Sequence, residues 1–118
     1  MGRLSTHVLD TANGRPAAGV GFELQRLDVP GRWVPVASGR TNQDGRTDQP
    51  LLAGDAFTPG TYQLIFNIGA YFAQQKNPPA SPPFLDRIPL QFTIADGEGH
   101  YHVPLLVSPW SYSTYRGS

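Results

Sequence analysis

The amino-acid sequence predicts an all-β fold, a two-sheet β-sandwich of about eight strands with one short helix. Two observations predict it. The chain has 13 Gly and 12 Pro among its 118 residues, and these fall between short apolar runs rather than in one block. Within those runs apolar and polar residues alternate, which is typical of half-buried strands joined by turns. No internal repeat is apparent, so we expect a single domain over residues 1–118.

Three strands are expected in the first part of the chain, at residues 4–10, 20–27 and 32–41. The first ends at "TANGRPAAG", because the Asn-Gly pair and the Pro interrupt a strand. Pro35 lies inside the third strand and has no backbone N–H, so this strand is expected at a sheet edge or with a bulge. Asp44 and Gly45 then predict a tight turn.

The second part of the chain predicts three further strands and the helix. Residues 60–68, 86–96 and 100–108 have the pattern of strands. The segment "GAYFAQQKN", residues 69–77, contains helix formers and is stopped by two prolines, so the short helix is expected there. Residues 109–118 are unusually aromatic and predict a final strand or an extended arm.

Charge and composition exclude several classes of function. Lys and Arg together number nine, as do Asp and Glu, so no broad basic surface for nucleic acid or for an anionic membrane is expected. The absence of Cys excludes disulfides and thiolate nucleophiles or metal ligands. No apolar run approaches the roughly 18 residues that span a bilayer, and no secretory signal is apparent, so we expect a cytoplasmic location.

The three histidines are candidate acids, bases or ligands. His100 and His102 belong to the segment "HYH", so on a strand their imidazoles share one face, roughly 7 Å apart. His7 lies within the first predicted strand. A histidine on a strand is most often a hydrogen-bonded or partly exposed side chain. Three imidazoles also suit a catalytic zinc ion, although the same strand has no obvious carboxylate to orient them. Both interpretations stay open at this point.

Arg46 and Arg116 are candidate anion-binding groups. Each has a simple alternative, since an Arg beside a turn is usually a solvated surface charge. Two guanidinium groups can instead bind a flat, oxygen-rich anion through forked hydrogen bonds. The chain has no G-x-S-x-G segment, so a catalytic serine triad is not expected.

Four segments together resemble the 5-hydroxyisourate hydrolases of the transthyretin-like family: "LSTHVLDTANGRPAAGV", "TNQDGRT", "PGTYQLIFNIGAYF" and "HYHVPLLVSPWSYSTYRGS". They follow one another over nearly the whole chain. The most diagnostic part is the terminal Tyr-Arg-Gly-Ser, which the hormone-carrying transthyretins lack. The resemblance implies an eight-stranded sandwich assembled as a homotetramer. It also implies a small-molecule substrate, 5-hydroxyisourate, hydrolysed in purine catabolism to 2-oxo-4-hydroxy-4-carboxy-5-ureidoimidazoline with no cofactor and no metal.

The resemblance further implies the site, position by position. The residues that match the family's active-site motifs are His7, Arg46, His102, Tyr115, Arg116, Gly117 and Ser118. All seven are expected to contact the substrate, and His7, Arg46, His102 and Ser118 are expected to be catalytic. The histidines would activate water while Arg46 binds ring oxygens and steadies negative charge. Which histidine is the base stays open, and so does any role of His100.

Two other functions are compatible with such a fold. A transthyretin-like protein can hold a small aromatic ligand without turning it over, and a structural β-sandwich module can dock on other proteins. The combination of His7, Arg46 and His102 with the terminal motif argues against both, because neither function requires that set.

Overall fold

The structure is a computed structural model that describes residues 1–79 and 81–117. Its strands are β1 (Arg3–Ser5), β2 (Val8–Asp10), β3 (Arg15–Pro16), β4 (Gly21–Val29), β5 (Arg32–Arg40), β6 (Leu52–Ala53), β7 (Gly60–Asn67), β8 (Arg87–Ile94), β9 (His100–His102), β10 (Leu105–Val107) and β11 (Tyr112–Ser113). A short 3-10 helix at Gly54–Ala56 follows β6, and the helix α1 (Ile68–Ala73) follows β7.

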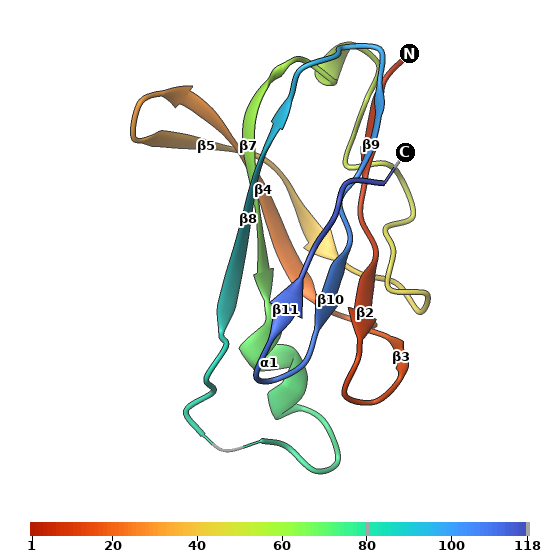
Figure 1. Cartoon of the computed structure of the whole chain (residues 1–118), viewed down its shortest axis with the longest axis vertical. Coiled ribbons are helices and arrows are strands. Elements are labelled where there is room, and N and C mark those ends of the chain that lie inside the picture. Colours follow the sequence, from red (N-terminus) through yellow and green to blue (C-terminus); the bar gives the residue numbers. More distant parts are fainter. Residues whose placement is uncertain (80, 118) are drawn as a thin grey trace.

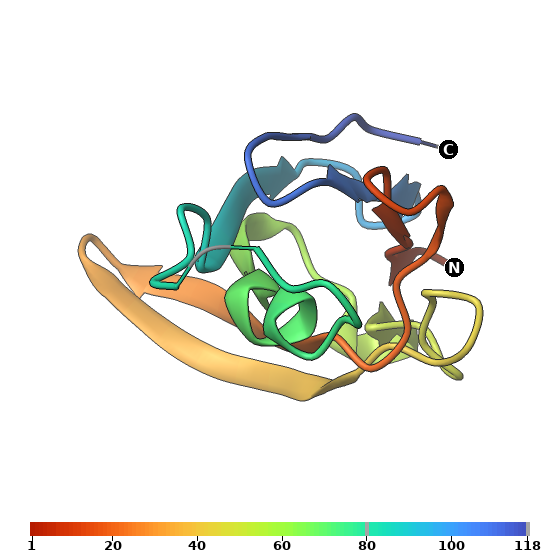
Figure 2. The same cartoon turned by 90° about the horizontal axis from the view of Figure 1, so that it is seen from below.

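The strands form two layers, which confirms the predicted all-β sandwich (Figures 1 and 2). One layer is the antiparallel sheet β5-β4-β7-β8. The other consists of the sheets β6-β1-β9 and β11-β10-β2-β3, which are continuous because β1 leads into β2 and β9 leads into β10. In this layer β1 pairs in parallel with β9, and β2 pairs in parallel with β10.

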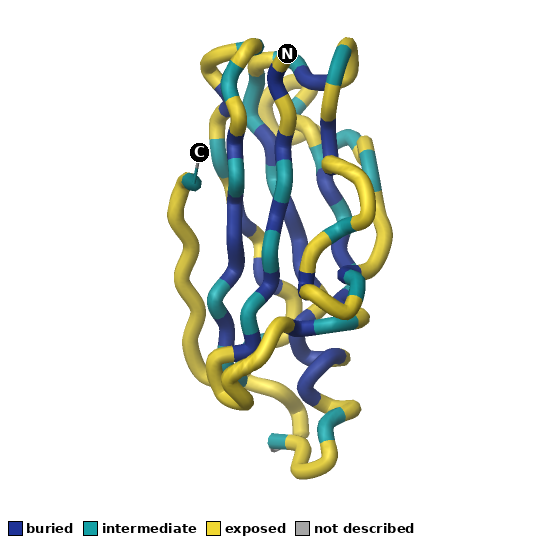
Figure 3. Tube along the Cα trace, turned by 90° about the vertical axis from the view of Figure 1, so that its right-hand side faces the viewer, coloured by how far each residue is buried: buried dark blue, intermediate teal, exposed yellow. Residues whose placement is uncertain are grey.

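The core lies between the two layers and is filled from both (Figure 3). Alternate residues of β4 and β7, among them Leu24, Leu64 and Phe66, are fully buried. Leu4 and Leu105 meet them from the other layer and are also fully buried. Strands with one buried face alternate in this way, so the period-two pattern of the sequence specifies which face packs inward.

Helix α1 lies at one end of the sandwich (Figure 1), and a side-chain hydrogen bond ties it to β2. Its Tyr71 hydroxyl donates a 2.7 Å hydrogen bond to the buried carboxylate of Asp10. The same carboxylate accepts hydrogen bonds from the backbone and side chain of Asn13, at 3.0 and 2.7 Å. Burial of a carboxylate is tolerated where such donors surround it. Within the described residues, no helix is long and apolar enough to cross a membrane.

The prediction of one unbroken strand at residues 4–10, and of another at 100–108, is wrong. Each is split in two, and the breaks lie side by side. Pro104 has no N–H to give to the ladder, and the buried Thr6 hydroxyl donates to the Val103 carbonyl at 2.7 Å. His7 therefore lies in the link between β1 and β2 rather than within a strand.

The other differences from the expected elements are smaller. The helix ends at Ala73, four residues before the expected end at residue 77. Strands β3 and β6 have only two residues each and were not expected from the sequence. The expectation for Pro35 is confirmed, since β5 is an edge strand with a register shift beside this residue.

Candidate active site

The parallel pairing of β1 with β9 sets polar side chains on one face of this layer. They are Arg3 and Ser5 from β1, and His100 and His102 from β9. Side chains alternate along a strand, so the residues between them point to the opposite face. Those residues, Leu4 and Tyr101, are buried in the core. One face of two short strands thus carries two imidazoles, a hydroxyl and a guanidinium.

His102 is half-buried and hydrogen-bonded through one ring nitrogen. Its Nδ1 lies 2.8 Å from the Ser5 hydroxyl, directly across the pairing. Burial lowers the pKa of His102 below its usual 6.5, and the positive charges of Arg46 and His7 lower this pKa further. His102 is therefore predominantly neutral at pH 7, which is the form that can accept a proton.

His7 is fixed by the turn that carries Arg46. Its Nε2 lies 2.8 Å from the backbone carbonyl of Asp44. A carbonyl oxygen only accepts hydrogen bonds, so Nε2 carries the proton and donates it. In the neutral imidazole Nδ1 is then the acceptor. The link between β1 and β2 and the turn at residues 42–46 are joined again by the Val8 N–H, which donates to the Gly45 carbonyl at 2.8 Å.

The turn itself is built by one asparagine and one glycine. The Asn42 side-chain oxygen accepts the backbone N–H groups of Asp44 and Arg46, at 2.9 and 3.1 Å. Gly45 has a φ of +74°, and a Cβ there would collide with the Val8 carbonyl. Glycine suits this backbone and this close approach. The expected turn at Asp44 and Gly45 is confirmed, and it holds Arg46 next to the histidines.

A pocket of about 330 Å³ opens on this face. Its lining residues are Arg3, Ser5, Arg46, His100, Tyr101 and His102. A second pocket, of about 250 Å³, shares Arg3, Ser5 and Arg46 with it. None of the described residues that line the first pocket carries a carboxylate, so these side chains suit a flat ligand with negative charge or with several oxygens. His7 lines neither pocket, although its charge acts on His102.

The C-terminal segment returns along β10 and β9 to the same region (Figures 1 and 3). Gly117 and His102 form an antiparallel bridge, with backbone hydrogen bonds of 2.7 and 3.2 Å. Of the predicted site residues, His7, Arg46, His102 and Gly117 are thus brought together. Ser118 lies outside the described residues.

Two predicted site residues face elsewhere in this chain. Tyr115 and Arg116 line a separate, mostly apolar groove of about 210 Å³ beside β8. The Arg116 guanidinium carbon lies 4.1 Å from the centre of the Tyr101 ring, which is a cation–π contact. The same guanidinium donates to the His100 carbonyl at 3.4 Å. Here Arg116 acts as a clamp that holds the C-terminal segment against β9.

No cluster of metal-ligating side chains in the described residues supports the interpretation of the histidines as a zinc site. Within residues 1–79 and 81–117, no group of three or more His, Asp or Glu side chains is placed to hold a metal ion.

Ser5 and Arg3 are the site residues that sequence reasoning missed. Their only signal was their position two and four residues before His7, and it became informative once the pairing with β9 was known.

Comparison with known proteins decides the family. The model of the HIUase/Transthyretin family matches residues 4–117. The chain belongs to this family. A Pseudomonas aeruginosa relative, "5-hydroxyisourate hydrolase", is 53% identical over 119 residues, which covers 100% of this chain and 93% of the relative. The expected kinship with 5-hydroxyisourate hydrolases and transthyretins is therefore confirmed.

Three solved structures resemble this member of the HIUase/Transthyretin family. An (S)-allantoin synthase matches with a TM-score of 0.92 and 50% identity over 99% of this chain, which spans only 44% of that longer chain. A Klebsiella pneumoniae 5-hydroxyisourate hydrolase matches with a TM-score of 0.81 and 36% identity, covering 100% of both chains. Transthyretin from Sparus aurata matches with a TM-score of 0.85 and 31% identity, covering 98% of this chain and 96% of that one.

Proposed function

We propose that this chain is a 5-hydroxyisourate hydrolase. The observation that carries the proposal is that Arg46 and His102 line one pocket, with His7 close enough for its charge to act on His102. The pocket occurs in a chain about half of whose residues are identical to those of a named 5-hydroxyisourate hydrolase. An imidazole base beside a guanidinium group supplies what hydrolysis of a cyclic amide requires, a proton acceptor and a positive charge for the developing oxyanion.

The reaction opens the six-membered ring of 5-hydroxyisourate at its N1–C6 amide. A water oxygen attacks the C6 carbonyl carbon and gives up a proton to the base. The C6–N1 bond then breaks, N1 takes up a proton, and the new carboxyl group ionises at neutral pH. The product is 2-oxo-4-hydroxy-4-carboxy-5-ureidoimidazoline, and one proton is released in each turnover.

His102 is suited to the role of base, because it lines the pocket and is neutral at pH 7. His7 donates Nε2–H to the Asp44 carbonyl, which leaves Nδ1 as an acceptor for a proton relayed through water. Arg46 lines the same pocket and would bind the oxygen on which negative charge develops. We assign the two histidines jointly to activation of water, with His102 as the group nearer to the pocket.

The C-terminal motif completes this proposal. Gly117 pairs with the backbone of His102. Contact of the Ser118 hydroxyl or carboxylate with the substrate stays a prediction, because Ser118 lies outside the described residues. Arg116 would act through its clamp on Tyr101 and His100. Direct contact of Tyr115 and Arg116 with the substrate stays a prediction.

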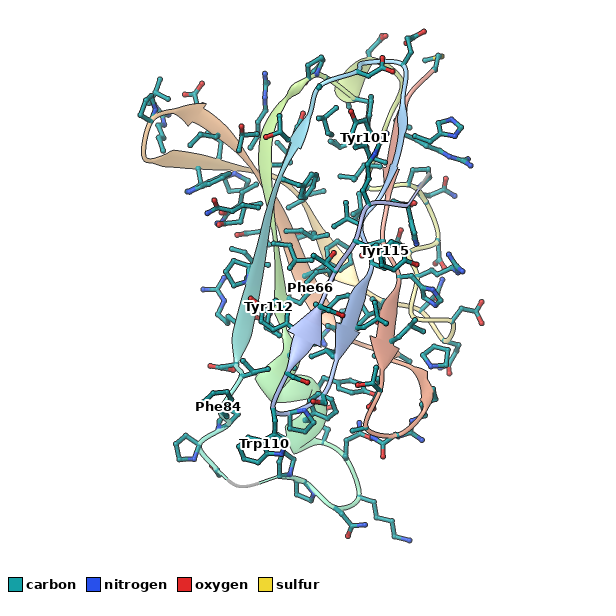
Figure 4. All side chains as sticks on the ribbon, viewed as in Figure 1. Phe66, Phe84, Tyr101, Trp110, Tyr112 and Tyr115 are labelled. Carbon is teal, nitrogen blue, oxygen red and sulfur yellow. The ribbon has the colours of Figure 1, made fainter. Side chains whose placement is uncertain are left out.

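We propose a homotetramer as the working assembly. Among the described residues, four aromatic side chains are exposed: Phe84, Trp110, Tyr112 and Tyr115 (Figure 4). The rings of Phe84 and Trp110 pack against each other at a tilt of 33°, with their centres 5.8 Å apart. Strands β8 and β11, beside these residues, are sheet edges. Exposed aromatic residues beside open edges indicate a surface that another copy covers. Light scattering after gel filtration tests the proposed assembly, with a tetramer mass expected and a monomer mass contradicting it.

The enzyme proposal is tested with freshly generated 5-hydroxyisourate, whose decay is followed by absorbance. The protein is expected to accelerate the decay well above the spontaneous rate. Activity should survive dialysis against a chelator, since no metal is assigned a role. No acceleration would refute the hydrolase, and loss of activity that zinc restores would refute the metal-free mechanism.

The second candidate function is binding without turnover. It is favoured by the 31% identity to a transthyretin, a family member with the same fold. Equilibrium dialysis with a small aromatic ligand tests it. Tight binding together with an unaccelerated decay of 5-hydroxyisourate would support the carrier.

A further inference from the structure

Ser5 holds the ring of His102 but is not among the residues that match the family's active-site motifs. Its hydroxyl lies 2.8 Å from Nδ1 of His102, although the two residues are 97 positions apart in the chain. The parallel pairing of β1 with β9 sets them directly opposite each other. Neighbouring strands lie about 4.8 Å apart, so side chains directly opposite each other on one face are close enough for this contact.

We propose that Ser5 is a positioning residue for His102. Its hydroxyl accepts the Nδ1–H of the neutral imidazole and so leaves the lone pair of Nε2 for the water that attacks the substrate. This inference rests on the proposed hydrolase function, since it concerns the base of that reaction. Ser5 contacts the ring of the base, and its proposed effect on the reaction acts through His102.

The backbone around this contact makes it a fixed one. The Ser5 carbonyl accepts the Val103 N–H at 2.9 Å, and the His102 backbone is bonded to Gly117. Both side chains are half-buried, which limits the other rotamers that they can adopt. A base held on both sides by paired strands keeps one orientation, and precise orientation is what general-base catalysis needs.

The chemical type of the side chain at position 5 affects the protonation of His102. Among the described residues, the charged or titratable groups around His102 are Arg3 on β1, His7 and Arg46 near it, His100 on its own strand and Arg116 of the C-terminal segment, with Asp44 and Asp48 in and after the turn. A carboxylate at position 5 would stabilise the imidazolium and raise the pKa of His102. A hydroxyl is uncharged, so it fixes the ring and its tautomer while leaving the base neutral at pH 7.

The neutral His102 ring has two tautomers, with the proton on Nδ1 or on Nε2, and only the first agrees with the role proposed for Ser5. A hydroxyl can also donate to Nδ1, in which case Nε2 would carry the proton and could not act as a base. Nitrogen-15 NMR of the His102 ring separates the two forms. The proposal requires protonated Nδ1 in the wild-type protein, and protonated Nε2 would overturn it. Because this measurement needs no turnover, it remains decisive if the hydrolase proposal itself fails.

The kinetic test uses three variants of the full-length chain. Ser5→Ala is expected to lower kcat about tenfold with little change in KM, because one orienting hydrogen bond is lost. Ser5→Thr keeps the hydroxyl and is expected to restore most of the rate. Ser5→Asp is expected to move the acid limb of the pH–rate profile to higher pH. Ser113→Ala, an exposed position on β11, is the matched control and should leave kcat unchanged.

Three results would overturn the role of Ser5. They are an unchanged kcat in a folded Ser5→Ala protein, equal losses in Ser5→Ala and Ser5→Thr, and an unshifted acid limb in Ser5→Asp. Circular dichroism identifies any variant that does not fold. The tautomer of His102 in the wild-type protein then decides the question alone. Inactivity of the wild-type protein would refute the hydrolase and leave the tautomer result to stand by itself.

Discussion

Gly117 and His102 are joined by two backbone hydrogen bonds, of 2.7 and 3.2 Å. A Cβ on residue 117 would lie 3.0 Å from Cδ2 of the His102 ring. That distance is shorter than a comfortable carbon–carbon contact. The C-terminal segment therefore packs directly on His102, the base of the proposed reaction. We expect small changes in this segment to alter the position of the His102 ring.

We expect Gly117→Ala to reduce kcat about tenfold or more while the protein stays folded. The added methyl group must displace either the imidazole or the segment, and a displaced base loses its alignment. Steady-state kinetics and a thermal melt check this together. Ser113→Ala, in the same segment but away from the ring, is the control. Equal activity of the two variants would show that the contact is unimportant.

We expect Arg46→Gln to lower kcat/KM about a hundredfold, since a charged donor to the developing oxyanion is lost. It should also move the acid limb of the pH–rate profile to higher pH. The positive charge of Arg46 lowers the pKa of His102, so its removal lets that pKa rise toward 6.5. Arg32→Gln, an exposed arginine on β5, serves as the control. An unmoved limb would contradict the coupling of Arg46 to His102.

We expect Gly45→Ala to cost more stability than Gly14→Ala. Both residues have positive φ, +74° and +66°, so both variants bear a backbone strain of about 1 kcal/mol. Only at Gly45 does a Cβ also collide with the Val8 carbonyl, whereas nothing lies near Gly14. Urea unfolding measures the difference, and activity should fall only in Gly45→Ala. Equal losses of stability would refute the steric argument.

We expect Tyr71→Phe to destabilise the fold by about 1–3 kcal/mol and to leave kcat unchanged, because a buried carboxylate loses one of its donors. Burial, together with the hydrogen bond and charge of Asp10, raises the pKa of Tyr71 to about 12. In the unfolded chain this pKa is near 10. The advantage of wild type over Tyr71→Phe is therefore complete below pH 10 and is lost as pH rises toward 12. Unfolding at pH 7 and pH 11 tests this, with Tyr112→Phe as an exposed control.

Much of the fold could be predicted from the sequence, because strand alternation and turn residues are local signals. They gave the strands that build the sandwich, the helix after β7, the irregularity at Pro35 and the turn before Arg46. The single domain over residues 1–118, the homotetramer and the cytoplasmic location remain predictions. The breaks at residues 6–7 and 103–104 were missed, because they depend on how two distant strands meet.

The site was predicted less completely, for the same physical reason. Motif resemblance marked His7, Arg46 and His102, but Ser5 acquires a role only through a register that joins residues 97 positions apart. For Tyr115 and Arg116 the motif and the structure differ. The motif predicts that both side chains contact the substrate, whereas in this chain they line the groove beside β8. A tetramer could bring that groove against another copy, which a single chain's sequence does not specify.

The most direct test of the proposed site compares the decay of freshly generated 5-hydroxyisourate with wild type, His7→Ala, His102→Ala and His100→Ala at equal concentrations. We predict that His7→Ala and His102→Ala keep the wild-type circular dichroism spectrum and lose at least a hundredfold in rate, as expected when a general base is removed. His100→Ala should lose much less. Near wild-type rates in both His7→Ala and His102→Ala would contradict the account.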